Sequence, residues 1–298
     1  MKYIITGSLG NISLPITKNL VAAGKDVTVI SSSINKKQEI ENLGAEAAIG
    51  SVKDKAFLNE TFKNADVAYL MIPNDFTVTD YPKFQREVAD NYVEAIKTSS
   101  IKHVVLLSSI GAHLRKGAGP IDALGYLEEQ LLKLENVHTK FLRPSYFFSN
   151  LYNLTGMIKH VGITGNNFGN TDEKLVLVHT DDIAAEATTQ LLDLSFTGNS
   201  IKYISGDERH PSEIAELLGK AVGKEGTPWI TFTDDESLKG MMEAGLTEGF
   251  ANLYVQMGKA IREGELQEDY WKNQPETFGK YKLEDFAKDF IVAYGKEA

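Results

Sequence analysis

A glycine turn joins a short apolar strand to a helix at the beginning of the sequence. The strand covers residues 2–6, and Gly7-Ser8-Leu9-Gly10-Asn11-Ile12-Ser13 follows it. This order suits the pyrophosphate of a bound nucleotide, because Gly7 permits a tight turn and Gly10 lets the backbone come close to the phosphates. The helix from about Asn11 then directs its unpaired N–H groups and its positive dipole end at the negative charge. Ser13 stands where a third glycine is usual, which departs from the common spacing. We predict that Gly7, Ser8, Leu9, Gly10, Asn11 and Ile12 contact a nucleotide cofactor.

The length and hydrophobic content allow a full core, in one large or two modest domains. The chain has 298 residues, of which 42% are hydrophobic. There is no run of ~18 consecutive apolar residues, so we expect no helical membrane span. The first expected strand begins at Lys2. This leaves no room for a signal peptide, and we therefore expect a cytoplasmic protein.

Charge and residue usage exclude several other classes of function. The formal net charge of −10 disfavours direct binding to a nucleic-acid backbone. The sequence contains no cysteine, which excludes disulfides, a thiol nucleophile and a thiolate metal site. The six histidines are scattered without the i, i+4 spacing of a helical metal site, so we expect no metal.

Strands and helices alternate along the first half of the chain. We expect strands at 2–6, 26–31, 46–49, 66–72, 102–109 and 139–143, and helices at 11–23, 36–42, 54–63, 81–98 and 122–134. Continuous apolar runs such as Val104 to Leu107 are typical of strands that are covered on both faces. Repeated β-α-β order predicts an α/β fold with a doubly wound parallel sheet, and a ligand crevice at the carboxyl ends of its strands.

The alternation breaks after Arg143. We expect a helix over 147–158, a loop over 162–170, a strand over 174–179, a helix over 181–192, a strand over 201–204, and helices at 211–222, 235–244, 249–262 and 283–293. We therefore predict a nucleotide-binding domain over 1–150 and a smaller, mostly helical C-terminal substrate lobe over 151–298. Part of 160–200 is expected to return to the first domain.

Several short motifs, in this order, resemble those of one protein family. They are Thr6-Gly7-x-x-Gly10, Leu107-Ser108-Ser109-Ile110-Gly111, Leu142-Arg143-Pro144 followed by Phe147 and Asn150, His179-Thr180-Asp181-Asp182-Ile183-Ala184, and Ser212-Glu213-Ile214-Ala215. The sequence is similar over nearly its full length to the NmrA-like group of atypical short-chain dehydrogenase/reductase proteins. The resemblance implies a Rossmann-type domain that binds NADP(H) or NAD(H). The group includes NADPH-dependent quinone and triphenylmethane-dye reductases, and redox sensors that bind the cofactor without evident turnover.

The end of the second strand favours NADP(H) over NAD(H). NAD-selective sites carry an acidic side chain there, whereas this chain has Ser31, Ser32 and Ser33, followed by Lys36 and Lys37. Hydroxyls and lysines accept a 2′-phosphate that a carboxylate would repel. The alternative is that this segment is only a solvated turn and helix start. By the resemblance, Ile72 and Pro73 line the adenine–ribose side of the site.

The usual proton relay of short-chain dehydrogenases is absent. That relay is Tyr-x-x-x-Lys, and none of the twelve tyrosines has lysine four residues later. By the resemblance, Ser108 and Ser109 lie beside the nicotinamide, although an ordinary turn at a strand end explains them equally well. Ser109 and Tyr126 are the weak candidates for catalytic residues.

A cluster after the sixth strand is the expected substrate pocket. It comprises Tyr146, Phe147, Phe148 and Asn150, with His113 from the loop after the fifth strand. Such a cluster suits a flat aromatic ligand, and core packing between the lobes is the alternative. Glu128 and Glu129 are expected on a solvated helix surface, and Arg143 is expected to pair with a carboxylate or with backbone.

Two functions remain open from the sequence. The first is a cytoplasmic NAD(P)H-dependent oxidoreductase that transfers hydride directly to a small apolar or aromatic electrophile such as a quinone. The second is an NADP(H)-sensing regulatory protein that acts through a protein partner without turnover. Neither involves direct binding to nucleic acid or to a membrane.

Overall fold

The computed structural model describes residues 1–169 and 173–296. Its main sheet has seven parallel strands in the order β10-β6-β5-β4-β1-β2-β3. The strands are β1 (Lys2–Ile5), β2 (Asp26–Ser31), β3 (Glu46–Ile49), β4 (Val67–Leu70), β5 (His103–Leu107), β6 (His138–Pro144) and β10 (Asn199–Ile204). The predicted doubly wound α/β fold is therefore confirmed, with the strand order of a Rossmann sheet.

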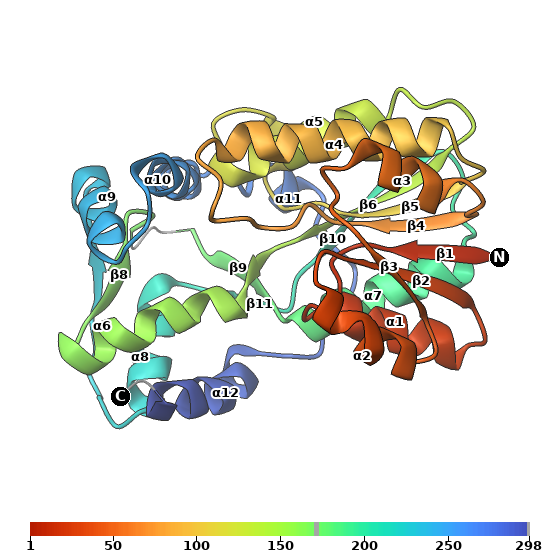
Figure 1. Cartoon of the computed structure of the whole chain (residues 1–298). Coiled ribbons are helices and arrows are strands. Elements are labelled where there is room, and N and C mark those ends of the chain that lie inside the picture. Colours follow the sequence, from red (N-terminus) through yellow and green to blue (C-terminus); the bar gives the residue numbers. More distant parts are fainter. Residues whose placement is uncertain (170–172, 297–298) are drawn as a thin grey trace.

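Helices cover both faces of this sheet (Figure 1). One face carries α1 (Ser13–Ala22), α2 (Lys37–Asn42) and α7 (Thr180–Asp193), and the other carries α3 (Lys55–Phe62), α4 (Tyr81–Lys97) and α5 (Asp122–Leu131). The central strands are buried along their length because apolar side chains on both of their faces meet these helices.

The strand order reverses between β1 and β4, which carry the segments expected to hold a ligand. The Thr6 N–H donates to the carbonyl of Tyr69 at 3.1 Å. The Met71 N–H donates to the Thr6 hydroxyl oxygen at 2.8 Å. These bonds place the glycine turn beside the segment that follows β4.

The remaining elements lie at the carboxyl ends of the main strands (Figure 1). They form a three-stranded sheet of β11 (Asp207–Arg209), β9 (Leu175–Val178) and β7 (Tyr146–Phe147), and a two-stranded sheet of β12 (Trp229–Thr231) and β8 (Thr164–Asn166). The helices around them are α6 (Thr155–His160), α8 (Pro211–Ala221), α9 (Asp234–Glu243), α10 (Glu248–Arg262), α11 (Glu268–Lys272) and α12 (Leu283–Lys296). A separate hydrophobic core holds this part together.

Two local predictions in this second part are only partly right. The helix expected over 147–158 begins one residue later, because Phe147 pairs with Val178 of β9, and it consists of a 3-10 helix η4 (Phe148–Leu154) followed by α6. The loop expected over 162–170 contains β8, which pairs with β12. Asn170 lies outside the described residues.

The chain crosses back to the main sheet after β9. Helix α7 buries Ile183, Ala187 and Leu191 in the core beneath the sheet, and β10 pairs with β6 at its edge. The division at residue 150, with this return, remains our proposal for the domains. No helix of the described residues is long and apolar enough to span a membrane.

Candidate functional site

Gly7 is required by the way that α1 packs on β1. Its φ of 88° lies in the left-handed region that favours glycine. An added Cβ would come within 2.5 Å of the Ser13 hydroxyl oxygen and within 2.9 Å of the Met71 Cγ. Ser13 is buried, and its hydroxyl donates to the Thr6 carbonyl at 2.9 Å. A serine at the third-glycine position therefore still permits close packing, because its hydroxyl fills the space that Gly7 leaves open.

The first turn of α1 presents backbone donors. Among the described residues, no protein group accepts a hydrogen bond from the backbone N–H of Asn11, Ile12 or Ser13. Pro15 has no N–H, and the first turn carries no acidic side chain. Gly10 is exposed, and a Cβ there would meet only the Gly7 carbonyl, at 3.2 Å. Gly10 and Asn11 are exposed and offer an open backbone to an anionic pyrophosphate, whereas Ile12 and Ser13 are buried behind them.

The end of β2 is linked to the glycine turn by serine hydroxyls. Ser8, with a φ of 54°, donates from its hydroxyl to that of Ser31 at 2.9 Å. The Ser31 hydroxyl oxygen also accepts the Ser33 N–H at 3.2 Å. Ser31 is buried, whereas Ser32 and Ser33 are exposed. The buried hydroxyl therefore shapes this turn, and the exposed pair faces outward.

The two lysines after this turn pair with carboxylates on α2, and their side chains are about half exposed. Lys36 lies 2.7 Å from Glu39, and Lys37 lies 3.9 Å from Glu41. Such exposed pairs contribute only about 0–1 kcal/mol, so both ammonium groups can exchange partners easily.

The segment after β4 is held close to the glycine turn. The Tyr92 hydroxyl donates to the Met71 carbonyl at 2.9 Å, which fixes the chain just before Ile72. Ile72 is buried and Pro73 is half-buried. The structure thus brings Ile72 and Pro73 to the same edge as Gly7.

Ser108 and Ser109 have different surroundings. Ser108 is buried, and its hydroxyl donates to the Glu128 Oε1 at 2.5 Å. Ser109 is half-buried, and its carbonyl accepts the Ala112 N–H at 3.2 Å. Ser108 therefore has a structural partner, whereas the Ser109 side chain stays the better candidate for contact with a ligand.

The expectation of a solvated Glu128 is wrong. Glu128 is 6% exposed, and it binds Arg143 through two hydrogen bonds. The expected pairing of Arg143 with a carboxylate is confirmed. Arg143 also donates to Tyr203 and to Asp269, at 3.0 Å each. Burial opposes the charge of Arg143, but the bonds and the charge of Glu128 outweigh it and raise its pKa above the ordinary value.

His113 lies beside this network, in the 3-10 helix η2 (Ala112–Leu114). Burial lowers the pKa of its imidazole, and the nearby charge of Asp269 partly opposes the shift. Both ring nitrogens are buried, so the imidazole is desolvated, and it lies within electrostatic reach of Asp269 and Arg143.

The structure does not bring Tyr126 to Ser109. The Tyr126 hydroxyl donates to Asp90 of α4 at 2.7 Å, and the Arg86 guanidinium lies 5.0 Å from its ring centroid. Glu128, two residues later on α5, faces Ser108. A separation of two residues is about 200° around a helix, so Tyr126 points away from that serine.

The five expected substrate-pocket residues are not all brought together. Tyr146 and Phe147 are half-buried in β7, and Asn150 is exposed in η4. Phe148 is fully buried, with its ring stacked 5.5 Å from that of Phe286. Phe148 thus fits the alternative of core packing.

Aromatic residues that the sequence analysis did not single out gather near the start of α4. The Phe250 ring of α10 lies 4.7 Å from Tyr81 and 4.8 Å from Phe76, which is 61% exposed. The Tyr254 ring lies 5.2 Å from Phe250. The 3–4-residue spacing of apolar side chains in α10 indicates a buried face, but not the segment that it meets.

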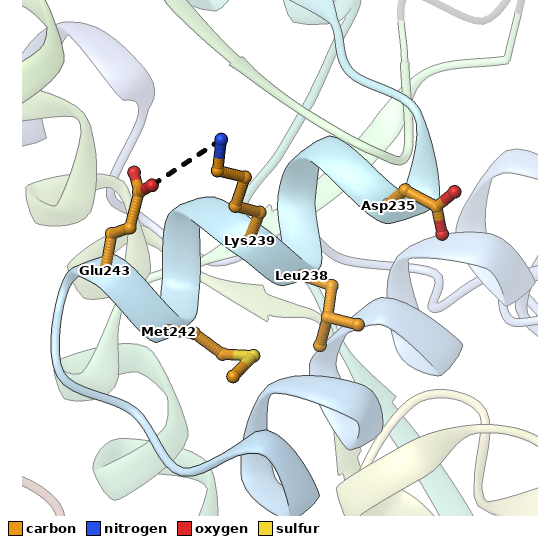
Figure 2. Close-up of a pocket in the computed structure, with 5 residues that line it drawn as sticks. All are labelled: Asp235, Leu238, Lys239, Met242 and Glu243. Carbon is orange, nitrogen blue, oxygen red and sulfur yellow. Dashed lines mark ion pairs between the residues drawn. The ribbon is translucent and has the colours of Figure 1, made fainter.

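The described residues also line two cavities elsewhere. One, of about 410 Å³, lies on α9 against Asp235, Leu238, Lys239, Met242 and Glu243. Figure 2 shows Leu238 and Met242 projecting from the same side of this helix, and the ion pair of Lys239 with Glu243. The other, of about 480 Å³, borders Tyr203 and Asp269 at the edge strand β10. Neither is lined by a residue that we predicted for the cofactor or substrate.

Comparison with known proteins agrees with the resemblance seen in the sequence. The NmrA-like family matches residues 2–260. An NAD(P)H azoreductase from Xenophilus azovorans is 21% identical over 98% of this chain and 99% of its own length. The prestalk A differentiation protein A of Dictyostelium discoideum is 23% identical over 96% of this chain and 93% of its own length.

Solved structures share the fold. A crystal structure of NADPH-dependent quinone oxidoreductase from Escherichia coli, complexed with NADPH, has a TM-score of 0.82 at 17% identity and covers 97% of this chain and 99% of its own. The triphenylmethane reductase of Citrobacter sp., complexed with NADP(H), has a TM-score of 0.77 at 17% identity, with coverage of 97% and 99%.

Proposed function

The chain belongs to the NmrA-like family, and from that premise we propose that it is a cytoplasmic NADPH-dependent reductase. Its substrate is a small, flat, apolar or aromatic electrophile such as a quinone. The observation that carries this proposal is the set of free backbone donors at Asn11, Ile12 and Ser13, beside the exposed Gly10. The names of the azoreductase, the quinone oxidoreductase and the dye reductase support it.

Each segment of the carboxyl edge has a role toward the cofactor. The donors of the first turn of α1 hold the pyrophosphate. Ser32 and Ser33 face the ribose, and Lys36 and Lys37 follow them. Since residues 31–37 contain no carboxylate, a 2′-phosphate meets no repulsion from them, which favours NADPH. Ile72 and Pro73 cover the adenine–ribose side, and Ser109 lies toward the nicotinamide.

The choice of electrophile follows from the missing relay. When bound, NADPH supplies the hydride, and the protein supplies binding, orientation and exclusion of water. No tyrosine of the chain has lysine at the fourth following position. A quinone needs little help from a proton during hydride transfer, because its oxygen accepts negative charge readily. A substrate of this kind therefore suits a site without a strong general acid.

A cofactor-binding regulator is the competing function. The similarity to a protein that is named for differentiation, and not for a reaction, supports this alternative. It requires NADPH binding without turnover, and a protein partner.

One experiment separates the two functions. The purified protein is titrated with NADPH and then assayed against quinones, enones and cationic dyes by the loss of reduced-nicotinamide absorbance. Turnover supports the reductase, whereas tight binding without turnover supports the regulator.

Gly10→Val should abolish NADPH binding while the fold is kept, because its side chain would occupy the phosphate surface. Gly240→Val on α9 is the matched control, since an added Cβ there meets no atom within 4 Å. Unchanged NADPH affinity in Gly10→Val would show that the turn is not the phosphate site.

A further inference from the structure

Two glycines in the segment after β5 lie directly against α10 and the loop that follows α10. At Gly119 an added Cβ would come within 2.0 Å of the Leu253 carbonyl oxygen of α10. At Gly111 it would come within 2.8 Å of the Leu266 side chain. Both glycines are buried, with φ values of 62° and 84° in the left-handed region that favours glycine. The segment and α10 therefore pack closely, and at Gly119 they pack backbone to backbone.

The segment is fixed on the side that faces away from α10. The Asp122 carboxylate of α5 accepts the Gly117 N–H at 3.0 Å. The 3-10 helix η3 (Gly119–Ile121) comes next, and the side-chain amide of Gln85 on α4 donates to its Pro120 carbonyl at 3.1 Å. Because α4 and α5 hold the segment, a larger residue at the first position of η3 must displace α10.

The amino-terminal part of α10 contacts a second segment, the one that follows Pro73 (Figure 1). The Phe250 ring lies 4.8 Å from the ring of Phe76 in this segment, and 4.7 Å from the ring of Tyr81 at the start of α4. Helix α10 therefore lies across the segments that continue from Pro73 and from Ser109, the two ends of the edge that we assign to the cofactor.

Helix α10 also connects the two hydrophobic cores. Phe250 packs in the core that α4 and α5 form with the main sheet. Ala260 and Ile261, near the other end of the helix, pack in the second core. Close packing recurs on that side, because an added Cβ at Gly258 would come within 2.0 Å of the Asn167 Oδ1. A displacement of α10 at η3 therefore moves the boundary between the cofactor edge and the second part of the chain.

We infer that Gly119 determines the size of the electrophile, because it lets α10 lie close to the cofactor edge. This inference rests on the proposed reductase function. A hydride acceptor has to lie against the nicotinamide, which that function places beside Ser109, and α10 is the boundary on this side. The close approach at Gly119 keeps the space for the acceptor narrow. A quinone of one ring therefore fits better than a quinone of three fused rings.

Gly119→Ala should widen this space. A Cβ essentially never lies within 3.0 Å of another atom, whereas this one would begin 2.0 Å from the Leu253 oxygen, so α10 has to shift outward by about 1 Å. A misplacement of that size can lower a rate about 100-fold. We expect kcat/KM to fall about 10- to 100-fold for benzoquinone, and by less than about threefold for the three-ring phenanthrenequinone.

Gly117→Ala is the matched control. Its φ of 91° makes an added side chain strained there too, but the added Cβ meets no atom within 4 Å. This variant should keep the wild-type ratio of kcat/KM for the two quinones. A loss of folded enzyme lowers both values by the same factor, so a purely structural role of Gly119 would leave the ratio unchanged. NADPH affinity should be unchanged in both variants, because the pyrophosphate surface lies on α1.

Phe250→Leu is a second variant, which tests the same boundary without backbone strain if Gly119→Ala does not fold. Leucine loses the ring contacts with Phe76 and Tyr81, so the ratio should shift in the same direction. If wild type reduces benzoquinone only, reduction of phenanthrenequinone by the variant supports the inference, and its continued absence contradicts it.

The remaining outcomes separate the inference from the proposed function. An unchanged ratio in Gly119→Ala, or in Phe250→Leu where Gly119→Ala does not fold, overturns the inference and leaves the reductase function standing. A wild type that prefers phenanthrenequinone does the same. If wild type reduces neither quinone, the proposed function is wrong and the inference is wrong with it.

Discussion

Arg143 holds Glu128 in a two-bonded ion pair, with Nε 3.0 Å from Oε1 and Nη2 2.6 Å from Oε2. The two side chains are only 5% and 8% exposed. The pair joins β6 to α5, and the Ser108 hydroxyl binds the same carboxylate. Tyr203 and Asp269 extend the contact to β10 and α11. The ion pair therefore fixes the strand ends on which Ser109 and Tyr146 are carried.

Removing the charge of Glu128 should destabilise the fold strongly. Glu128→Gln leaves the buried Arg143 with Asp269, at 3.0 Å, as its remaining anionic partner. Breaking a buried pair costs about 3–5 kcal/mol, and we expect a loss near the lower end because Asp269 still compensates part of the charge. The neighbouring Glu129→Gln is the control, because the Glu129 side chain is 39% exposed and pairs only with the exposed Lys133, at 3.2 Å, and Arg115, at 3.7 Å. Its loss should cost less than about 1 kcal/mol. The measurement is urea unfolding of both variants, and equal losses would contradict the assigned role of Arg143.

This pair also shows what the sequence could not reveal. Adjacent residues of a helix point about 100° apart. Because α5 packs on a sheet, one of Glu128 and Glu129 must therefore lie closer to the sheet than the other. The pattern alone does not tell which one faces inward. The partner Arg143 is fifteen positions away and is brought close only by the pairing of β5 with β6.

The main sheet was predictable because its signal is local. Short apolar runs such as Val104 to Leu107 alternate with amphipathic helices, and right-handed crossovers leave few arrangements for such units. The three-residue strands β8 and β12 carry no comparable pattern and exist through pairing with each other. The contact of Phe250 with Tyr81 is likewise tertiary, since the two residues are far apart in sequence.

Ser31→Asp should reverse the preference between the two cofactors. The Ser31 oxygen accepts the Ser33 N–H and the Ser8 hydroxyl, and a carboxylate can accept both bonds, so we expect the turn to survive. The added charge would repel a 2′-phosphate and favour the free ribose hydroxyl. Titration should show weaker binding of NADPH and tighter binding of NADH, whereas Ser31→Asn, of similar size, should shift the ratio much less. A wild type that prefers NADH would end this argument.

Stability should fall at mildly acidic pH through His113. Burial lowers the pKa of this imidazole below 6.5 in the folded protein. Between the lowered pKa of the folded state and the pKa of about 6.5 in the unfolded state, the unfolded chain binds more protons than the folded one. The free energy of unfolding therefore rises with pH in this range. It decreases as pH falls below about 6.5. His103, whose pKa is also lowered by burial and by His138, should add to this slope.

His113→Gln tests this linkage. The variant should show a smaller loss of unfolding free energy than wild type between about pH 7 and pH 5, and the double variant with His103→Gln should show a smaller loss still. Chemical denaturation at several pH values gives the slopes. A slope in His113→Gln as steep as in wild type would mean that this imidazole is not held neutral by the fold.

No single side chain among the first catalytic candidates should be indispensable as a proton donor. The Tyr126 hydroxyl is bonded to Asp90, and this bond, followed by burial, raises its pKa, so it is a poor acid that faces α4. Ser109 has no Tyr-x-x-x-Lys motif with which to act in proton transfer, because no tyrosine of the chain has lysine four residues later. Tyr126→Phe and Ser109→Ala should therefore each lose less than about tenfold in kcat, or roughly 1.4 kcal/mol of barrier. Steady-state kinetics with a quinone, with NADPH affinity measured in parallel, checks both variants.

Removing a true general acid lowers the rate by about 10²–10⁴-fold. A loss of that size in Tyr126→Phe, with NADPH still bound, would show that α5 supplies a proton after all, and that direct hydride transfer without a relay is the wrong mechanism for this site.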